Sequence, residues 1–227
     1  MLFENRREAG RQLAAALKKW KGQDCVVLAL PRGGVPVAAE VADALGAPLD
    51  LLLVRKIGAP RQPELAIGSV IDGGIPIIVQ DRELIRLTGT SSREFDEICA
   101  LELAEIERRH KFYLGDHPPQ PLAGRIAIVV DDGLATGNTM RAALQAARLR
   151  RPGTLIMAVP VAPKDTIEEF RSLADHVVCL ATPDPFGAVG NFYEDFRPTS
   201  DAEVIHLMKD KPAHVTPAKA PGSRHEA

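Results

Sequence analysis

Two adjacent carboxylates are the first candidates for a ligand site in this sequence. Asp131 and Asp132 follow an apolar segment at residues 125–130 and precede the sequence Gly-Leu-Ala-Thr-Gly-Asn-Thr at residues 133–139. Neighbouring carboxylates repel each other, which costs stability unless hydroxyl groups, cations or a ligand use them. The pair is therefore a candidate acceptor for the hydroxyl groups of a sugar.

The residues after this pair can hold an anion. Gly133 and Gly137 permit a tight or positive-φ backbone, and a helix is predicted to begin within residues 135–139. Free N–H groups at the start of a helix bind anions, and Thr136 and Thr139 add hydroxyl donors. Sugar-hydroxyl acceptors beside phosphate donors are the combination that a phosphorylated ribose needs. The alternative is an ordinary strand-to-helix turn capped by an aspartate.

A second candidate anion loop follows the apolar segment at residues 25–30. Arg32 supplies positive charge, and Gly33 and Gly34 let the backbone approach an anion closely. Arg-Gly-Gly turns are common, so a structural turn is the alternative.

Two further cations follow the apolar segment at residues 49–54. Arg55 and Lys56 would stand at the carboxyl end of a second strand, where they could neutralise a diphosphate. A solvated strand end is the alternative for these two residues.

Apolar segments of five or six residues alternate with helix-like segments along most of the chain. The predicted strands are residues 25–30, 49–54, 125–130, 154–159 and 176–180, and the predicted helices are about residues 5–20, 36–45, 91–110, 139–150 and 165–173. This alternation is typical of a parallel sheet covered by helices on both faces. Such sheets bind ligands at the carboxyl ends of their strands, where the polar groups described above fall.

One part of the chain departs from this alternation. Residues 57–80 are rich in glycine and proline, with β-like pieces at residues 66–71 and 75–79, and predict a hairpin or another excursion from the sheet. Glu64 is a polar candidate within it, although an exposed loop carboxylate is the favoured interpretation.

An aromatic segment, residues 185–196, follows the last predicted strand. It contains three of the seven Phe residues and one of the two Tyr residues of a chain that is 4% aromatic. Phe186, Phe192 and Tyr193, with Val189 among them, could stack on a planar base and are candidate acceptor-binding residues. A satellite hydrophobic cluster or a dimer contact is the alternative.

The composition limits the class of protein. Apolar residues form 45% of the 227 residues, which predicts a globular chain, and the net charge of −2 gives no basic field for nucleic acid. The three separated cysteines predict reduced thiols in a cytoplasmic protein, and no apolar run is long enough for a membrane span. We therefore predict a single domain at residues 1–208 and a disordered tail at residues 209–227.

Residues 129–139 resemble the 5-phosphoribosyl-1-pyrophosphate (PRPP) signature of type I phosphoribosyltransferases. This segment and the family signature share one order of residues: apolar residues, two acids, two variable residues, a small residue and Thr-Gly-x-Thr. Gly133 departs from the pattern, because the family usually has an apolar residue there. The resemblance implies an α/β fold with a parallel-sheet core, flanking helices, a hairpin or flexible-loop excursion and a small C-terminal hood.

The resemblance also implies a role for each polar group. Asp131 and Asp132 would bind the ribose. The implied 5-phosphate loop consists of Ala135, Thr136, Gly137, Asn138 and Thr139, and the implied pyrophosphate ligands are Arg32, Gly33, Gly34, Arg55 and Lys56. Residues 58–71 would correspond to a mobile loop that closes over the reacting centre, and the aromatic segment to part of a base-binding hood.

The implied activity is displacement of pyrophosphate from PRPP by a nitrogenous acceptor. Mg²⁺ is the implied cofactor, held mainly through PRPP oxygens, with Asp131 and Asp132 as candidate ligands. A homodimer is compatible with the family, and neither the acceptor nor a general base is assigned. Two alternatives stay open: a non-catalytic PRPP-sensing regulator of the same fold, and another phosphosugar or nucleotide-binding enzyme on a similar sheet.

Overall fold

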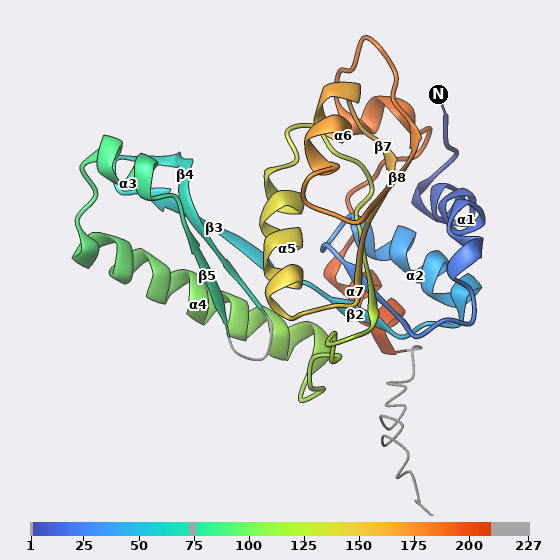
Figure 1. Cartoon of the computed structure of the whole chain (residues 1–227), viewed down its shortest axis with the longest axis horizontal. Helices are drawn as coiled ribbons and strands as arrows, with labels where there is room; N and C mark the ends of the chain where they lie inside the picture. The colour runs from blue at the N-terminus through green and yellow to red at the C-terminus, as the bar shows by residue number, and fades with distance from the viewer. Residues whose placement is uncertain (1, 73–75, 210–227) are drawn as a thin grey trace, which may run out of the picture.

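The computed structural model describes residues 2–72 and 76–209, and its centre is a parallel sheet. Five strands form this sheet in the order β2-β1-β6-β7-β8 (Figure 1). The strands are β1 (Cys25–Ala29), β2 (Leu49–Leu51), β6 (Ile126–Val130), β7 (Thr154–Val161) and β8 (His176–Ala181). The predicted α/β fold class is confirmed.

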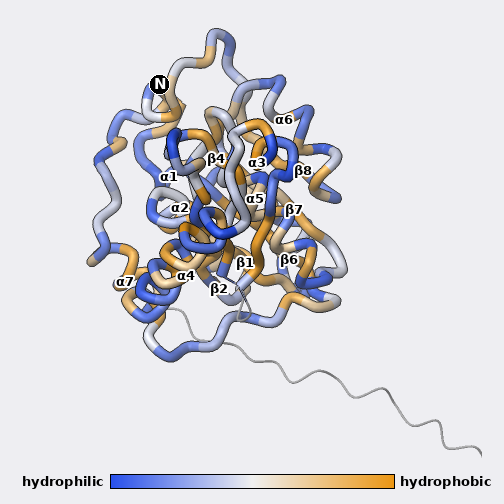
Figure 2. Tube along the Cα trace, turned by 90° about the vertical axis from the view of Figure 1, so that its left-hand side faces the viewer, coloured by the Kyte–Doolittle hydropathy of each residue, from blue (hydrophilic) through white to orange (hydrophobic). Residues whose placement is uncertain are grey.

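Helices cover both faces of this sheet. One face packs against α1 (Arg6–Ala16), η1 (Lys18–Trp20), α2 (Gly34–Leu45) and α7 (Asp201–Lys209), and the other against α5 (Asn138–Leu149) and α6 (Lys164–Phe170). Successive side chains of β1 alternate between these clusters, with Val27 in the first and Val26 and Leu28 in the second. The central strands are accordingly hydrophobic along their length, and hydrophilic residues lie on the outer turns (Figure 2).

A second, antiparallel sheet projects from the core as an arm (Figure 1). It contains β3 (Val54–Ala59), β4 (Gln62–Ile71) and β5 (Ile77–Gln80) in that order, followed by α3 (Arg82–Thr88) and α4 (Ser92–Leu114). Ile57 and Ile67 on the sheet join Phe95 and Cys99 of α4 in one buried cluster. The predicted excursion is therefore an ordered antiparallel sheet. Residues 58–71, which were expected to form a mobile loop, instead form strands on either side of a short turn.

The predicted parallel strand at residues 49–54 is confirmed over residues 49–51 only, and its predicted end is wrong. β2 ends at Leu51, and Val54 already belongs to β3 of the arm. Leu52 and Leu53 are buried between the two strands, so the chain stays apolar while it changes sheet. Hydropathy alone does not mark such a crossing.

Two short helices were not predicted. α3 has seven residues and α7 has nine, which is too short for a clear helical period in the sequence. The predicted tail lies outside the described residues, apart from Lys209, which ends α7. Within the described ranges, no helix has the length and hydrophobicity needed to cross a membrane.

The starts of α1, α4 and α5 have clear local causes. The Asn5 side chain accepts from the N–H of Glu8 at the start of α1, and Ser91 and Glu94 form a capping box at the start of α4. Gly137, in the left-handed conformation with φ of 72°, precedes α5. These caps determine where the helices that adjoin the candidate site begin.

Candidate functional site

The two aspartates and the first glycine turn meet at the carboxyl edge of the sheet. β1 and β6 are hydrogen-bonded neighbours, so the loops that follow them lie side by side. A Cβ atom on Gly33 would collide with Oδ2 of Asp132, and one on Gly34 would lie 3.0 Å from Oδ1 of Asp131. Only glycine fits this close approach. The residues predicted to bind the ribose are therefore in contact with the glycines predicted to bind the pyrophosphate.

Both carboxylates are half-buried, with the Asp132 side chain 13% exposed, and their electrostatics follow from that. Burial raises the pKa of Asp131 and of Asp132, and the charge of Asp132 raises the pKa of Asp131 further. Oδ1 of Asp131 accepts a hydrogen bond from the N–H of Asp132 at 2.9 Å. Oδ2 of Asp132 accepts one from Nε of Arg6 at 2.7 Å, which opposes the effect of burial on the pKa of Asp132. Such a pair favours a cation or hydroxyl donors beside it.

The loop after the aspartates faces outward at the start of α5. Thr136, Asn138 and Thr139 are exposed, and Gly137 places the loop at the helix N-terminus. The main-chain carbonyl of Ala135 accepts a hydrogen bond from Thr166 of α6 at 3.3 Å. The loop therefore combines helix N–H groups and accessible hydroxyl groups, which is the donor set that a phosphate uses.

Arg32 lies at the same edge but points to a helix that was not predicted. Its guanidinium lies 3.5 Å from Oδ1 of Asp201, at the start of α7. The hydroxyl group of Tyr113 on α4 donates to the same oxygen at 2.5 Å. Asp201 was not predicted as a site residue, because no pattern in the sequence indicated a helix at that position. Both Arg32 and Asp201 have side chains that are about half exposed, at 49% and 47%.

Arg55 and Lys56 do not end a strand of the parallel sheet, and the structure separates them. They are neighbours on β3, so their side chains point to opposite faces. Arg55 lines a small cavity with Pro31 and Thr139 and pairs with Glu102 at 2.7 Å. Lys56 pairs with Glu64 at 2.7 Å, on the exposed side of the arm.

Glu64 itself is an exposed carboxylate. Its side chain is 95% exposed, and the hydrogen bond from Lys56 lowers its pKa. The expected exposure of Glu64 is therefore confirmed, but the residue lies on β4 and not in a loop.

Much of the aromatic segment packs on itself and on the N-terminus. Phe186 and Phe192 are half-buried and lie 5.0 Å apart between ring centroids. Tyr193 is 2% exposed between Phe3 and Phe196, and its hydroxyl group donates to the main-chain carbonyl of Asp132 at 2.6 Å. The Tyr193 ring cannot stack on a ligand, so the satellite-cluster alternative describes this residue.

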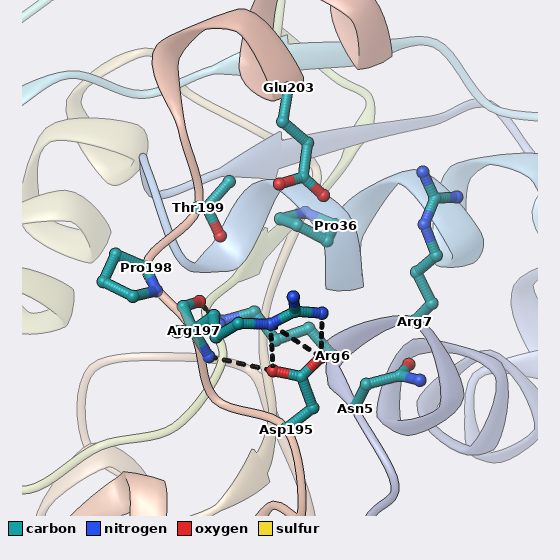
Figure 3. Close-up of a pocket in the computed structure, with 9 residues that line it drawn as sticks. All are labelled: Asn5, Arg6, Arg7, Pro36, Asp195, Arg197, Pro198, Thr199 and Glu203. Carbon is teal, nitrogen blue, oxygen red and sulfur yellow. Dashed lines mark hydrogen bonds and ion pairs between the residues drawn. The ribbon is translucent and has the colours of Figure 1, made fainter.

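Arg6 is a second residue that the sequence did not reveal. It is 126 positions from Asp132, and no local pattern indicates their contact. A cavity of about 510 Å³ lies beside Arg6, between the start of α1, the first turn of α2 and residues 195–203. In Figure 3, Asp195 pairs with Arg197 on one wall and Glu203 of α7 lies opposite.

The residues at this edge fit Mg²⁺ held mainly by a substrate. Asp131 and Asp132 offer carboxylate oxygens, which Mg²⁺ prefers, and sites of this kind use one or two carboxylates plus phosphate oxygens. Among residues 2–72 and 76–209, no cluster of three or more His, Cys, Asp or Glu side chains could hold a metal by protein atoms alone.

The fold is that of a parallel α/β protein whose polar loops gather at the carboxyl edge of the sheet. Residues 3–197 match the family model described as the phosphoribosyl transferase domain. The chain therefore belongs to the phosphoribosyl transferase domain family.

Two similar proteins support this assignment. The Mycobacterium tuberculosis H37Rv protein named "Putative phosphoribosyl transferase Rv0571c" is 48% identical over 207 residues, which cover 91% of this chain and 46% of that protein. The crystal structure of TT1426 from Thermus thermophilus is 40% identical, with a TM-score of 0.80 over 92% of this chain and 98% of that chain. The chain thus spans about half the length of the curated relative.

Proposed function

We propose that this chain binds PRPP with Mg²⁺ and transfers the phosphoribosyl group to a nitrogenous acceptor, with release of pyrophosphate. One observation carries the proposal. The half-buried aspartate pair, the N-terminus of α5 and the glycine turn at residues 33–34 converge on a single edge of the sheet. Membership of the family supports the same donor.

Each part of that edge suits one part of the donor. Asp131 and Asp132 would accept hydrogen bonds from the ribose 2- and 3-hydroxyl groups. Residues 135–139 would bind the 5-phosphate through main-chain N–H groups and the hydroxyl groups of Thr136 and Thr139. Holding both ends of the ribose orients carbon 1, which is the main task when the transition state develops positive charge on the sugar.

The diphosphate end would lie between β1 and the base of the arm. The main chain at Gly33 and Gly34 can approach an anion closely, and Arg32 and Arg55 supply positive charge. Bound Mg²⁺ would neutralise the diphosphate as it leaves. Lys56 is left out of this set, because its side chain lies on the other face of β3 from Arg55.

The acceptor is a nucleobase or a related small molecule in this proposal. Phe186, Val189 and Phe192 remain the candidates for contact with it, since they are half-buried rather than buried. We assign no general base to the reaction.

The test is a double substitution in the aspartate pair. Asp131→Asn with Asp132→Asn should weaken PRPP·Mg²⁺ binding at least tenfold by calorimetry, because the loss of charge-assisted hydrogen bonds costs about 1.5–3 kcal/mol each. Asp96→Asn with Glu97→Gln is the matched control, since this acidic pair is exposed on α4. Unchanged PRPP affinity in the Asp131/Asp132 variant would contradict the proposal.

A screen of acceptors separates an enzyme from a regulator. Purines, pyrimidines, orotate and small amines should be incubated with PRPP·Mg²⁺ and the wild-type chain, with pyrophosphate release as the readout. Turnover with one acceptor supports the transferase. Tight PRPP binding without turnover by any acceptor would favour the PRPP-sensing alternative.

A further inference from the structure

Asp132 is held by residues from opposite ends of the described chain. Nε of Arg6 donates to its Oδ2 at 2.7 Å, and the hydroxyl group of Tyr193 donates to its main-chain carbonyl at 2.6 Å. The Arg6 and Asp132 side chains are only 11% and 13% exposed. Both the main chain and the side chain of Asp132 are therefore fixed by contacts that lie outside the motif at residues 129–139.

Arg6 is in turn held on two further sides. Its guanidinium lies 3.8 Å from the centroid of the Phe196 ring, within the range of a cation–π interaction. Its NH1 group donates to the main-chain carbonyl of Arg197 at 2.8 Å. The guanidinium thus has a defined orientation before any ligand binds.

The two chain segments that supply these contacts are joined by their main chains. The N–H of Phe3 donates to the carbonyl of Phe192 at 3.0 Å, and the N–H of Glu194 donates to the carbonyl of Phe3 at 2.9 Å. The N–H of Asp195 donates to the carbonyl of Glu4 at 2.9 Å. Arg6, Tyr193 and Phe196 therefore belong to one packed unit around Asp132.

Stability alone does not account for this contact. Desolvation of a buried ion pair offsets most of the attraction between its charges, so such pairs contribute little net stability. The contact instead fixes the orientation of the Asp132 carboxylate. A guanidinium that is itself held by three contacts can pair with the carboxylate in few orientations. One oxygen of Asp132 is bound by Arg6, as one oxygen of Asp131 is bound by the N–H of Asp132.

We propose that Arg6 is a positioning residue for the sugar site: it orients the Asp132 carboxylate so that the second oxygen accepts a hydrogen bond from a ribose hydroxyl group. This inference rests on the proposed function, since it assumes that Asp132 binds the ribose. It makes the first residues of the chain part of the donor site, although they lie far from the motif in the sequence.

The experiment measures discrimination between sugars rather than affinity alone. Dissociation constants for ribose 5-phosphate and for its 2-deoxy and 3-deoxy analogues are measured by calorimetry with the full chain. The wild-type chain should prefer ribose 5-phosphate to at least one analogue about tenfold, which corresponds to one hydrogen bond to a charged acceptor. Arg6→Gln should reduce that preference to near onefold, while affinity for the deoxy analogue changes little.

Two further variants separate positioning from a general structural effect. Arg6→Lys keeps the charge and should restore part of the preference, and Phe196→Leu removes the ring beneath Arg6 and should lower the preference partially. Arg11→Gln, at an exposed position of α1, is the matched control and should keep the wild-type preference. Should Arg6→Gln fail to fold, as judged by thermal melting, the Arg6→Lys and Phe196→Leu variants decide the question.

The outcomes distinguish this inference from the proposed function. A wild-type chain that binds neither PRPP nor ribose 5-phosphate overturns the proposed function. A wild-type chain that prefers ribose 5-phosphate, with the same preference in Arg6→Gln, overturns the role of Arg6 alone. Equal weakening of all three sugar phosphates by Arg6→Gln also overturns it, because that is the signature of a loosened fold.

Discussion

Gly133 departs from the apolar residue that the family usually has, and its surroundings explain the departure. A Cβ atom at this position would lie 2.6 Å from Cγ1 of Val189 and 3.0 Å from Cγ1 of Val161. The aromatic segment therefore packs directly on the main chain of the ribose motif. The small residue allows that packing, and no ligand group is lost.

Replacing this glycine should disturb both the packing and the motif. Gly133→Ala is expected to lower the free energy of unfolding by about 1–3 kcal/mol, because the new methyl group overlaps Val189. Val189→Ala in the same chain should recover part of the loss. Urea denaturation of the two single variants and the double variant measures this coupling, and strictly additive effects would contradict the contact.

The element β3 decides which of two neighbouring cations can reach the site. Side chains alternate along a strand, so Arg55 and Lys56 face opposite sides of the arm. Arg55 adjoins Pro31 and Thr139, whereas Lys56 pairs with Glu64 near the solvent. The sequence indicates a pair of cations but does not show that they lie on an antiparallel strand.

This geometry predicts unequal effects on pyrophosphate binding. Arg55→Ala should weaken pyrophosphate affinity about tenfold, because it removes a cation that lines the cavity beside the glycine turn. Lys56→Ala, as the matched neighbour, should leave that affinity within about twofold. Calorimetric titration with pyrophosphate and Mg²⁺ tests both variants. Equal losses of pyrophosphate affinity would contradict the placement of Arg55 alone beside the diphosphate.

At the scale of the whole molecule, His110 pairs α4 with the end of β4, where the arm meets the core. Nδ1 of His110 on α4 lies 2.5 Å from Oδ2 of Asp72, the residue after β4, and the N–H of Asp72 donates to the carbonyl of Leu53. Burial lowers the pKa of His110, but the hydrogen bond and charge of Asp72 and the carbonyl of His117 outweigh it, so the pKa is raised overall. The protonated form of His110 therefore stabilises its pairing with Asp72 in the folded chain.

The stability of the molecule should depend on pH through this residue. A histidine with a raised pKa in the folded state contributes stability fully below its unfolded pKa of about 6.5, and loses it as pH rises through the folded pKa. The difference in unfolding free energy between wild type and His110→Gln should therefore be larger near pH 6 than near pH 8.5. Urea denaturation at both pH values measures it, and a difference independent of pH would contradict the assignment.

Much of the fold and part of the site could be predicted from local sequence alone. Near-continuous apolar segments are typical of strands buried on both faces, and they correctly indicated four strands of the parallel sheet and the start of β2. The aspartate pair, its glycines and the following helix start lie within eleven neighbouring residues at 129–139, so their proximity requires no tertiary information. The rule that ligands bind at the carboxyl ends of parallel strands placed residues 31–34 beside them.

Tertiary structure alone decided the contacts between distant elements. The change of sheet between Leu51 and Val54 leaves no mark in hydropathy, since the residues between are buried in either arrangement. The contact of Arg6 with Asp132 depends on the N-terminal segment pairing with residues 192–195. A sequence determines which side chains prefer burial, but only packing determines which partner each one meets.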